Sequence, residues 1–138
     1  MTALVRVRGN LGQDFRLSPV NSPSREEPFM VLNFSIASPV FRRNAEGKRE
    51  IVATEWFSCE YWKPDADHLH KILQKGMPAL VEGEEYLETY TNRNGEEVQD
   101  RRIRVSDIFI VASERIEGIS LRPKREQSNN VSDVPSDI

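Results

Sequence analysis

The stretch Glu55-Trp-Phe-Ser-Cys-Glu-Tyr-Trp62 decides the fold, because its residues alternate between two kinds of surface. Side chains of a β-strand point to opposite faces in turn. Phe57, Cys59 and Tyr61 therefore share one face, which is suited to a protein core. The residues on the other face are Trp56, Ser58, Glu60 and Trp62.

The face that carries the two indoles has two interpretations. Large aromatic planes beside polar groups on a sheet are what a protein needs to stack the bases of an unpaired strand. Aromatic side chains also dominate interfaces, so a covering loop or a second subunit would produce the same pattern. This strand by itself leaves both interpretations open.

The segments around this strand predict a mainly β fold. Residues 18–28 contain three prolines and predict a loop, while residues 42–50 predict an exposed hairpin loop. Gly83 predicts a bulge, and Asn92–Gly95 predicts a hairpin turn. Pro39 is expected to end the second strand. The further strands are expected at residues 4–8, 29–38, 79–90, 98–105 and 108–111.

The segment Pro64–Gly76 is the one good helix candidate. Asp65 or Asp67 is placed to cap its start, and Lys75-Gly76 is a usual closing signal. Its apolar stripe is Leu69, Ile72 and Leu73. About five strands with one helix between the third and the fourth is the order of the oligonucleotide-binding (OB) barrel.

The length of 138 residues fits one folded domain, which we place at residues 1–113. Residues 114–138 are expected to form a flexible tail, since Ser, Asn, Asp and Pro dominate residues 127–137 and cannot bury a core. The N-terminus lacks the apolar segment of a secretory signal, and no run of 18 apolar residues occurs. We therefore expect a cytoplasmic protein without membrane contact. Cys59 is expected to be a small buried hydrophobe.

Motifs for catalysis or metal binding are not found. His68 and His70 are two residues apart on the expected helix and point away from each other, so one ion does not suit both. No second ligand cluster, phosphate-binding loop or nucleophile motif accompanies them. We therefore expect no enzymatic activity, no metal and no cofactor.

The net charge of −3 argues mildly against nucleic acid, but the distribution of charge matters more than its sum. Acids gather at residues 82–88 and 96–100. Such segregation gives either one basic face or ordinary cross-strand pairing, which is the more common case. The basic side chains placed to neutralise phosphates are those of Arg6, Arg8, Arg42, Arg43, Lys48, Arg49, Arg102 and Arg104. The aromatic residues placed to stack bases are Phe41, Trp56, Trp62 and Tyr90.

At these residues the chain resembles the bacterial single-stranded-DNA-binding proteins, over roughly residues 4–111. The matching segments come in the family's order with suitable spacing. They are Arg8-Gly-Asn-Leu-Gly-Gln-Asp14, Asn33-Phe-Ser-Ile-Ala37, Thr54-Glu-Trp56, Lys75-Gly76, Val81-Glu-Gly83 and Tyr90-Thr-Asn-Arg-Asn-Gly95. The family's four base-stacking positions fall on Phe41, Trp56, Trp62 and Tyr90.

The resemblance implies an OB fold that coats unpaired DNA without reading its sequence, in replication, recombination, repair or the transfer of plasmids and other mobile elements. It implies a homo-oligomer, usually a tetramer with a dimer as the alternative, in the cytoplasm at the nucleoid. It implies no enzymatic activity and no cofactor. A different role on the same fold, as an accessory protein of a primosome or of conjugation, stays open.

The departures from the family concern charge. Glu84, Glu85 and Glu88 stand on a strand where relatives usually carry bases, and Ser58 and Pro64 replace typically basic positions. Fewer phosphate contacts predict weaker binding and a shallower dependence on salt. The family's tail docks partner enzymes. Here the corresponding residues are Asp133, Pro135, Asp137 and Ile138, without the family's terminal Phe.

Overall fold

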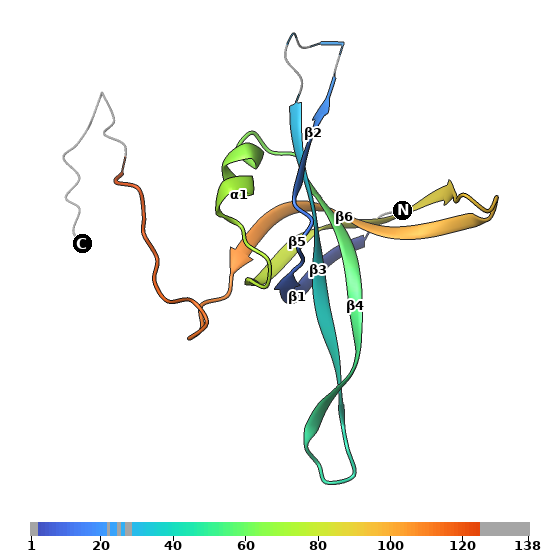
Figure 1. Cartoon of the computed structure of the whole chain (residues 1–138), viewed down its shortest axis with the longest axis vertical. Helices are drawn as coiled ribbons and strands as arrows, with labels where there is room; N and C mark the ends of the chain where they lie inside the picture. The colour runs from blue at the N-terminus through green and yellow to red at the C-terminus, as the bar shows by residue number, and fades with distance from the viewer. Residues whose placement is uncertain (1–2, 22, 25, 27–28, 125–138) are drawn as a thin grey trace.

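The computed structural model describes residues 3–21, 23–24, 26 and 29–124, and their main body is a β-barrel (Figure 1). The single helix of these residues is α1 (Ala66–Ile72). The strands are β1 (Ala3–Leu11), β2 (Arg16–Val20), β3 (Phe29–Arg43), β4 (Arg49–Tyr61), β5 (Pro78–Thr91) and β6 (Glu97–Ile110). Among the described residues, no helix is long and apolar enough to cross a bilayer.

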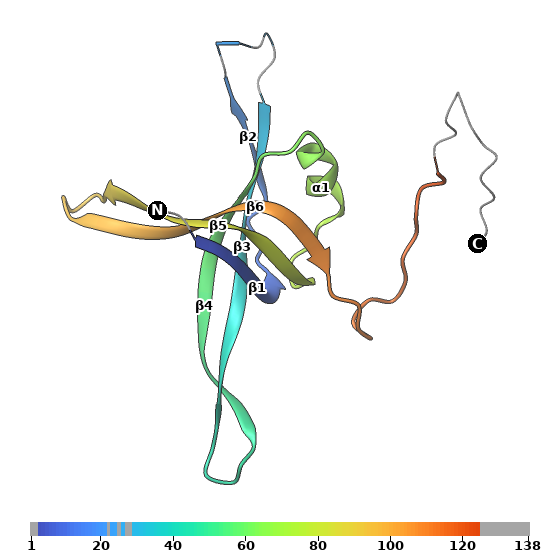
Figure 2. The same cartoon turned by 180° about the vertical axis from the view of Figure 1, so that it is seen from behind.

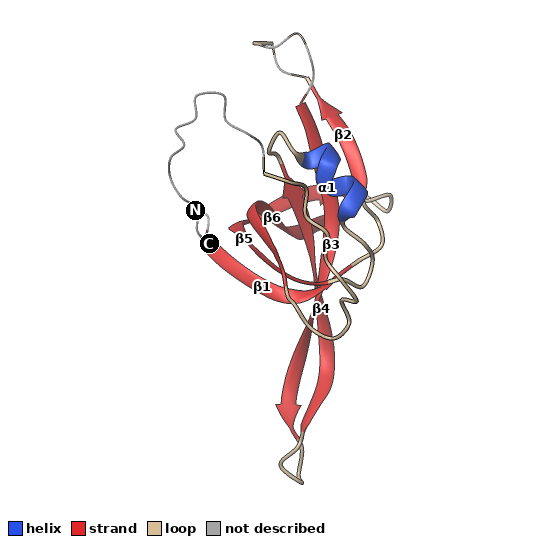
Figure 3. Ribbon diagram, turned by 90° about the vertical axis from the view of Figure 1, so that its left-hand side faces the viewer, coloured by secondary structure: helices blue, strands red, loops and turns tan. Residues whose placement is uncertain are grey.

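The sheet closes because β1 pairs with two strands. The strand order is β1-β5-β6-β4-β3-β2, and an additional pairing of β1 with β3 completes a ring of five strands, with β2 outside it. β4 and β6 run parallel, while the other pairs are antiparallel. In the chain, α1 comes between the third and the fourth strand of the ring, and in space it lies beside β2 and β3 (Figure 3). The predicted OB barrel is therefore confirmed.

Gly9 makes the closure of the ring possible. At this point β1 leaves β5, with Asn10 opposite both Pro78 of β5 and Ala37 of β3. A Cβ atom on Gly9 would collide with the backbone carbonyl of Ala37 and would lie 3.1 Å from the Cα atom of Ser38. Only glycine lets two backbones approach this closely without displacing one of them.

The core lies inside the ring and is built from alternate residues of each strand. Phe57, Cys59 and Tyr61 of β4 are all buried, which confirms the core face that the alternation predicts. Their partners across β3 are Ile36, Phe34 and Leu32. Ala66 of α1 and Leu73, which follows the helix directly, join this cluster, so α1 covers one end of the barrel beside β2 and β3 (Figure 1).

Two long hairpins extend out of the barrel, one formed by β3 and β4 and the other by β5 and β6 (Figures 1 and 2). Asn44 organises the first turn by accepting hydrogen bonds from two backbone N–H groups, and Asn92 does the same in the second. Gly47 and Gly95 complete the turns with φ of 80°. The hairpin turn predicted at Asn92–Gly95 is confirmed.

Several strand boundaries differ from the sequence prediction. Residues 18–20, predicted as loop, belong to β2 and pair with β3. β3 does not end at Pro39 but continues to Arg43. Among the described residues this part of β3 pairs with β4 on one side only, so a proline without an N–H group interrupts no pairing with a second strand. The two strands predicted at 98–105 and 108–111 are one strand, because the bulge predicted at Gly83 absorbs an extra residue of β6.

The predicted N-cap position at Asp65 is confirmed, but capping by its side chain and the end of the helix at Lys75-Gly76 were wrong. Asp65 occupies the N-cap position, but its carboxylate accepts a hydrogen bond from the Tyr61 hydroxyl at 2.6 Å and caps no backbone N–H. The helix ends at Ile72, followed by Leu73 in an extended conformation. Gly76 lies further on, and its N–H donates to the carbonyl of Leu11 at 2.7 Å, so this glycine turns the chain toward β5. Ile72 is 47% exposed and belongs only partly to the apolar stripe.

Candidate nucleic-acid interface

Trp56 lies on the outer face of β4 and is 62% exposed. Its partner on β3 is Ala37, which leaves the indole uncovered on that side. A Cβ atom on Gly12 would lie 3.2 Å from the indole Cζ3 atom, so the absence of a side chain there makes room for the ring. Beside the indole is a hollow of about 490 Å³, whose polar lining includes Asn10, Gln13, Asp14, Ser35 and Lys75.

Phe41 lies further along the same hairpin and is 45% exposed. The Cζ atom of Arg49 stands 4.1 Å from the centre of its ring, a cation–π contact across the two strands. Both residues line a hollow of about 560 Å³ together with Arg8 of β1. An aromatic ring and the guanidinium of Arg49 therefore lie at one open site, which Arg8 also lines.

Trp62 follows directly after β4 and is half-buried. Its indole N–H donates to Glu60 at 3.4 Å, and the Cζ atom of Arg104 stands 5.1 Å from the ring centre. The fourth aromatic residue, Tyr90, is 49% exposed on β5, opposite Val98 near the tip of its hairpin. The four aromatic residues thus occupy separate positions: Phe41 and Trp56 lie on the β3–β4 hairpin, Trp62 lies just beyond β4, and Tyr90 lies on the β5–β6 hairpin.

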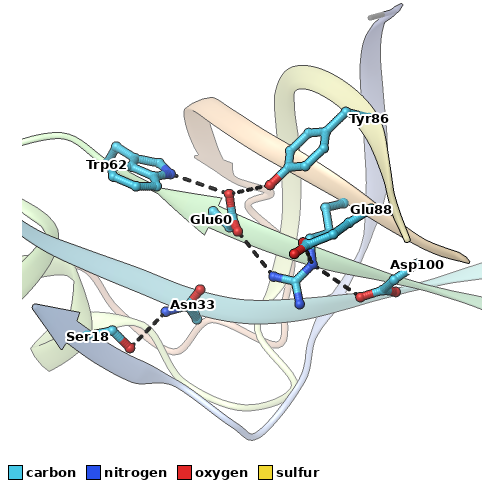
Figure 4. Close-up of polar contacts among 8 residues, drawn as sticks. Ser18, Asn33, Glu60, Trp62, Tyr86, Glu88 and Asp100 are labelled. Carbon is cyan, nitrogen blue, oxygen red and sulfur yellow. Dashed lines mark hydrogen bonds and ion pairs between the residues drawn. The ribbon is translucent and has the colours of Figure 1, made fainter. Parts of the chain in front are cut away.

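Glu60 organises a polar network that the sequence reasoning did not single out (Figure 4). Its carboxylate accepts hydrogen bonds from the Tyr86 hydroxyl at 2.7 Å and from Arg102 at 3.1 Å, besides the one from Trp62. Burial, together with this hydrogen bond, raises the pKa of Tyr86 to about 12. Arg104 also stands 5.8 Å from the ring centre of Tyr86, so it lies close to two aromatic rings.

A signal for Tyr86 was present in the sequence. The predicted hairpin turn pairs Thr91 with Glu97, and counting back along the two strands places Tyr86 opposite Arg102. Side chains that lie opposite each other across two strands share a face. The turn alone therefore indicates that the side chain of Tyr86 lies on the same face of the sheet as the basic side chain of Arg102 on β6.

Two of the predicted phosphate-binding residues, Arg6 and Arg102, are paired with acids. Arg6 pairs with Glu82 at 2.6 Å, directly across β1 and β5. Arg102 contacts three carboxylates, and the neighbouring Arg101 pairs with Glu85 at 2.7 Å. For these residues the cross-strand pairing that the sequence left open is the correct interpretation.

Arg102 has a shifted pKa as a result. Burial lowers this pKa, but the charge of Glu88, the hydrogen bond to Glu60 and the charge of Asp100 raise it more. The guanidinium is therefore held in its charged form more firmly than an exposed arginine.

The remaining predicted bases have a different environment. Within the part of the chain that the structure describes, no ion pair involves Arg8, Arg42, Arg43, Lys48, Arg49 or Arg104. Arg43 donates to the carbonyl of Gly47 at 2.8 Å and thereby braces the turn. The unpaired positive charge therefore gathers on the β3–β4 hairpin, close to Phe41.

The other sequence-based candidates lie elsewhere. His68 and His70 are on α1, and among the described residues no group of three or more His, Cys, Asp or Glu is arranged to hold a metal ion. The predicted docking residues Asp133, Pro135, Asp137 and Ile138 lie outside the described residues, as does the segment 127–137.

Comparison with known proteins finds similar single-stranded DNA-binding proteins. The single-stranded DNA-binding protein of Halalkalibacterium halodurans is 28% identical over 104 residues, which is 75% of this chain and 54% of the relative. The chain thus spans about half the length of that protein. Among solved structures, a small single-stranded DNA-binding protein from Streptomyces coelicolor matches 80% of this chain and 94% of its own, with a TM-score of 0.66 at 16% identity.

A single-strand binding protein of Plasmodium falciparum, solved in complex with single-stranded DNA, covers 79% of this chain and 94% of its own. Its TM-score is 0.63 at 20% identity. These likenesses support the same barrel. The model of the Single-strand binding protein family matches residues 4–111, which include all the strands of the barrel and both hairpins. The chain therefore belongs to the Single-strand binding protein family.

Proposed function

We propose that this protein binds single-stranded DNA without reading its sequence and protects it during replication, recombination, repair or the transfer of mobile elements. The observation that carries the proposal is the exposed indole of Trp56 on a sheet face, with Phe41 and unpaired bases on the same hairpin. Membership of the family supports it. Each base stacked on an aromatic ring contributes about 1–3 kcal/mol to binding.

In this proposal the residues have two roles. Phe41, Trp56, Trp62 and Tyr90 stack bases, and the predicted arginines and lysine contact phosphates. Arg8, Arg42, Arg43, Lys48, Arg49 and Arg104 are available at once, whereas Arg6 and Arg102 must first leave their carboxylates. Stacking on Trp56 is expected to be independent of the identity of the base, because it uses the π-face that all bases share.

The first test is a titration of the protein with oligo-dT while tryptophan fluorescence is followed at low and at high salt. Strong quenching that weakens with salt is expected, because stacking quenches the indole and salt competes with the phosphates. Trp56→Ala is expected to weaken binding ~5- to 150-fold, the equivalent of one lost stack.

The matched control for Trp56→Ala is Leu121→Ala. This leucine is 84% exposed and lies outside the strands, so its loss removes apolar surface without touching the hairpins. Circular dichroism checks that both variants keep the fold. Unchanged affinity in Trp56→Ala and in Trp62→Ala would count decisively against stacking at these positions.

We further propose that residues 1–113 form the binding domain and residues 114–138 a tail. The end of the family match at residue 111 supports this division, as does the lack of helix or strand in residues 114–124. The protein is proposed to act as a homo-oligomer, a tetramer or a dimer, in the cytoplasm at the nucleoid, without enzymatic activity or cofactor. Light scattering and DNA binding of the 1–113 fragment test the division and the assembly.

The second candidate is an accessory protein of a primosome or of conjugation that acts through protein contacts. It is favoured by the acids of β5, because they neutralise Arg6, Arg101 and Arg102. This candidate requires a partner complex that survives nuclease treatment of a lysate. Recovery of no partner would remove it.

A further inference from the structure

Arg102 lies on the path of the proposed DNA strand. It is opposite Ser58 in the pairing of β6 with β4, and Ser58 lies between Trp56 and Trp62 along the chain. Six residues of a strand span roughly 20 Å, so a DNA segment stacked on both indoles passes this point. Arg102 and Ser58 also line an open hollow of about 190 Å³.

The guanidinium of Arg102 already contacts three carboxylates, those of Glu60, Glu88 and Asp100, which Figure 4 labels. Glu60 lies 3.1 Å from its Nη1 atom, while Glu88 and Asp100 lie 2.9 Å and 3.2 Å from its Nε atom. A carboxylate and a phosphate offer a guanidinium the same pair of charged acceptor oxygens. The acids therefore occupy the Nη1 and Nε side of the guanidinium, where a phosphate would compete with them. Glu60 accepts a hydrogen bond from Nη1, whereas Glu88 and Asp100 act on Nε through their charge without a hydrogen bond.

Glu88 and Asp100 differ from Glu60 in what else they do. Glu60 also accepts hydrogen bonds from Tyr86 and Trp62, so it has a structural role of its own. Glu88 and Asp100 are direct partners across β5 and β6, and like charges in such positions repel. Among the described residues, their recorded ion pairs are with Arg102 alone. Within the described residues, Arg102 is therefore the one ion-pair partner that these two acids share.

We propose that Glu88 and Asp100 limit the affinity of this protein for single-stranded DNA by holding Arg102 in place of a phosphate. The inference rests on the proposed function. The Nη1 and Nε atoms of Arg102 reach a phosphate only by exchanging their carboxylates, and the free energy of that exchange is subtracted from the free energy of binding. Removing the two charges strengthens binding and adds one phosphate contact.

The experiment measures the dissociation constant for oligo-dT, at several salt concentrations, in the full chain and in Glu88→Gln and Asp100→Asn. Each substitution is expected to tighten binding about 2- to 5-fold, the equivalent of one partly exposed ion pair. The slope of log K against log salt is expected to steepen by up to about 0.7, the value for one additional phosphate contact on a single strand.

The matched control is Glu97→Gln, which removes the same charge from an exposed position on the same hairpin. It changes the general field of the protein but not the partners of Arg102. Each substitution is also made in an Arg102→Gln background, where the gain in affinity is expected to disappear. Circular dichroism verifies that the Arg102→Gln variant folds. If it does not fold, the comparison of Glu88→Gln with Glu97→Gln tests the inference by itself.

The outcomes separate the inference from the proposed function. If the wild-type chain binds oligo-dT and Glu88→Gln gains no more affinity than Glu97→Gln, the inference is overturned and the proposed function stands. A gain that persists without Arg102 overturns it as well. If neither the wild-type chain nor the two variants bind DNA, the proposed function fails and the inference fails with it.

Discussion

Cys59 shows at the scale of one residue how the face of a strand determines chemistry. It lies on the core face of β4 and is 1% exposed, as the alternation predicts. Burial, together with the charge of Glu60, raises the pKa of its thiol to about 12. Since the thiolate is the reactive form, a thiol with this pKa is inert at neutral pH.

We therefore predict that Cys59 does not react with a thiol-specific disulfide reagent at pH 8 in the folded protein. In urea the same thiol is expected to react completely, because unfolding exposes it and returns its pKa to the ordinary value of 9.0. The measurement is the absorbance of the released leaving group over time. Rapid reaction without denaturant would mean that β4 opens far more readily than its packing implies.

Among the larger elements, the hairpin of β3 and β4 depends on a single irregularity. Phe41 is opposite Ile51, but Val40 is opposite Ala53, so Val52 is an extra residue in β4. Counting back from the turn without this bulge would place Trp56 opposite the buried Ile36. The bulge shifts the pairing by one residue, and a one-residue shift moves a side chain to the other face.

The junction of β1 and β3 offers a test at the same scale. We predict that Gly9→Ala lowers the free energy of unfolding by about 1–3 kcal/mol or more, because its Cβ atom would collide with the Ala37 carbonyl. Urea unfolding followed by circular dichroism measures it. The control is Gly118→Ala, where nothing lies within 4 Å of the added atom and no change is expected. Equal stability of the two variants would contradict the close approach.

The whole molecule couples its stability to alkaline pH through groups that fold in their neutral form. The pKa of Cys59 and that of Tyr86 are both raised to about 12, and the hydroxyl of Tyr61 is shifted in the same direction by burial and by Asp65. In the unfolded chain these groups lose their protons near 9.0 and 10.0. The folded state therefore binds more protons, and stability falls as pH rises.

We predict that the urea midpoint does not change with pH near pH 7, where these groups are protonated in both states. It is expected to fall progressively between pH 9 and 12, the interval between the pKa values of the unfolded and the folded state. The measurement is urea unfolding at a series of pH values. Tyr86→Phe removes one of the titrating groups, so its stability is expected to fall less steeply with pH, whatever its stability at pH 7. An identical slope in this variant would exclude Tyr86 from the effect.

The sequence by itself determined the class of fold, the core face of β4 and the turn of the β5–β6 hairpin. These features are local: period-two alternation follows from strand geometry, and the turn follows from the residues that tolerate a positive φ. For the same reason the register of β5 against β6, and with it the pairing of Tyr86 with Arg102, could be predicted from the sequence.

Only the tertiary structure decided which basic side chains are free of carboxylate partners, and which residues of β3 and β4 lie opposite each other. Whether Arg42 or Arg102 has a carboxylate from another strand beside it depends on residues that are distant in the chain. Of the three partners of Arg102, Glu60 comes from β4 and Glu88 from β5, while Asp100 lies on β6 itself. The bulge at Val52 and the collision-free closure at Gly9 likewise depend on the other strand. Electrostatic pairing and strand register are properties of two or more segments together, and a single segment does not contain them.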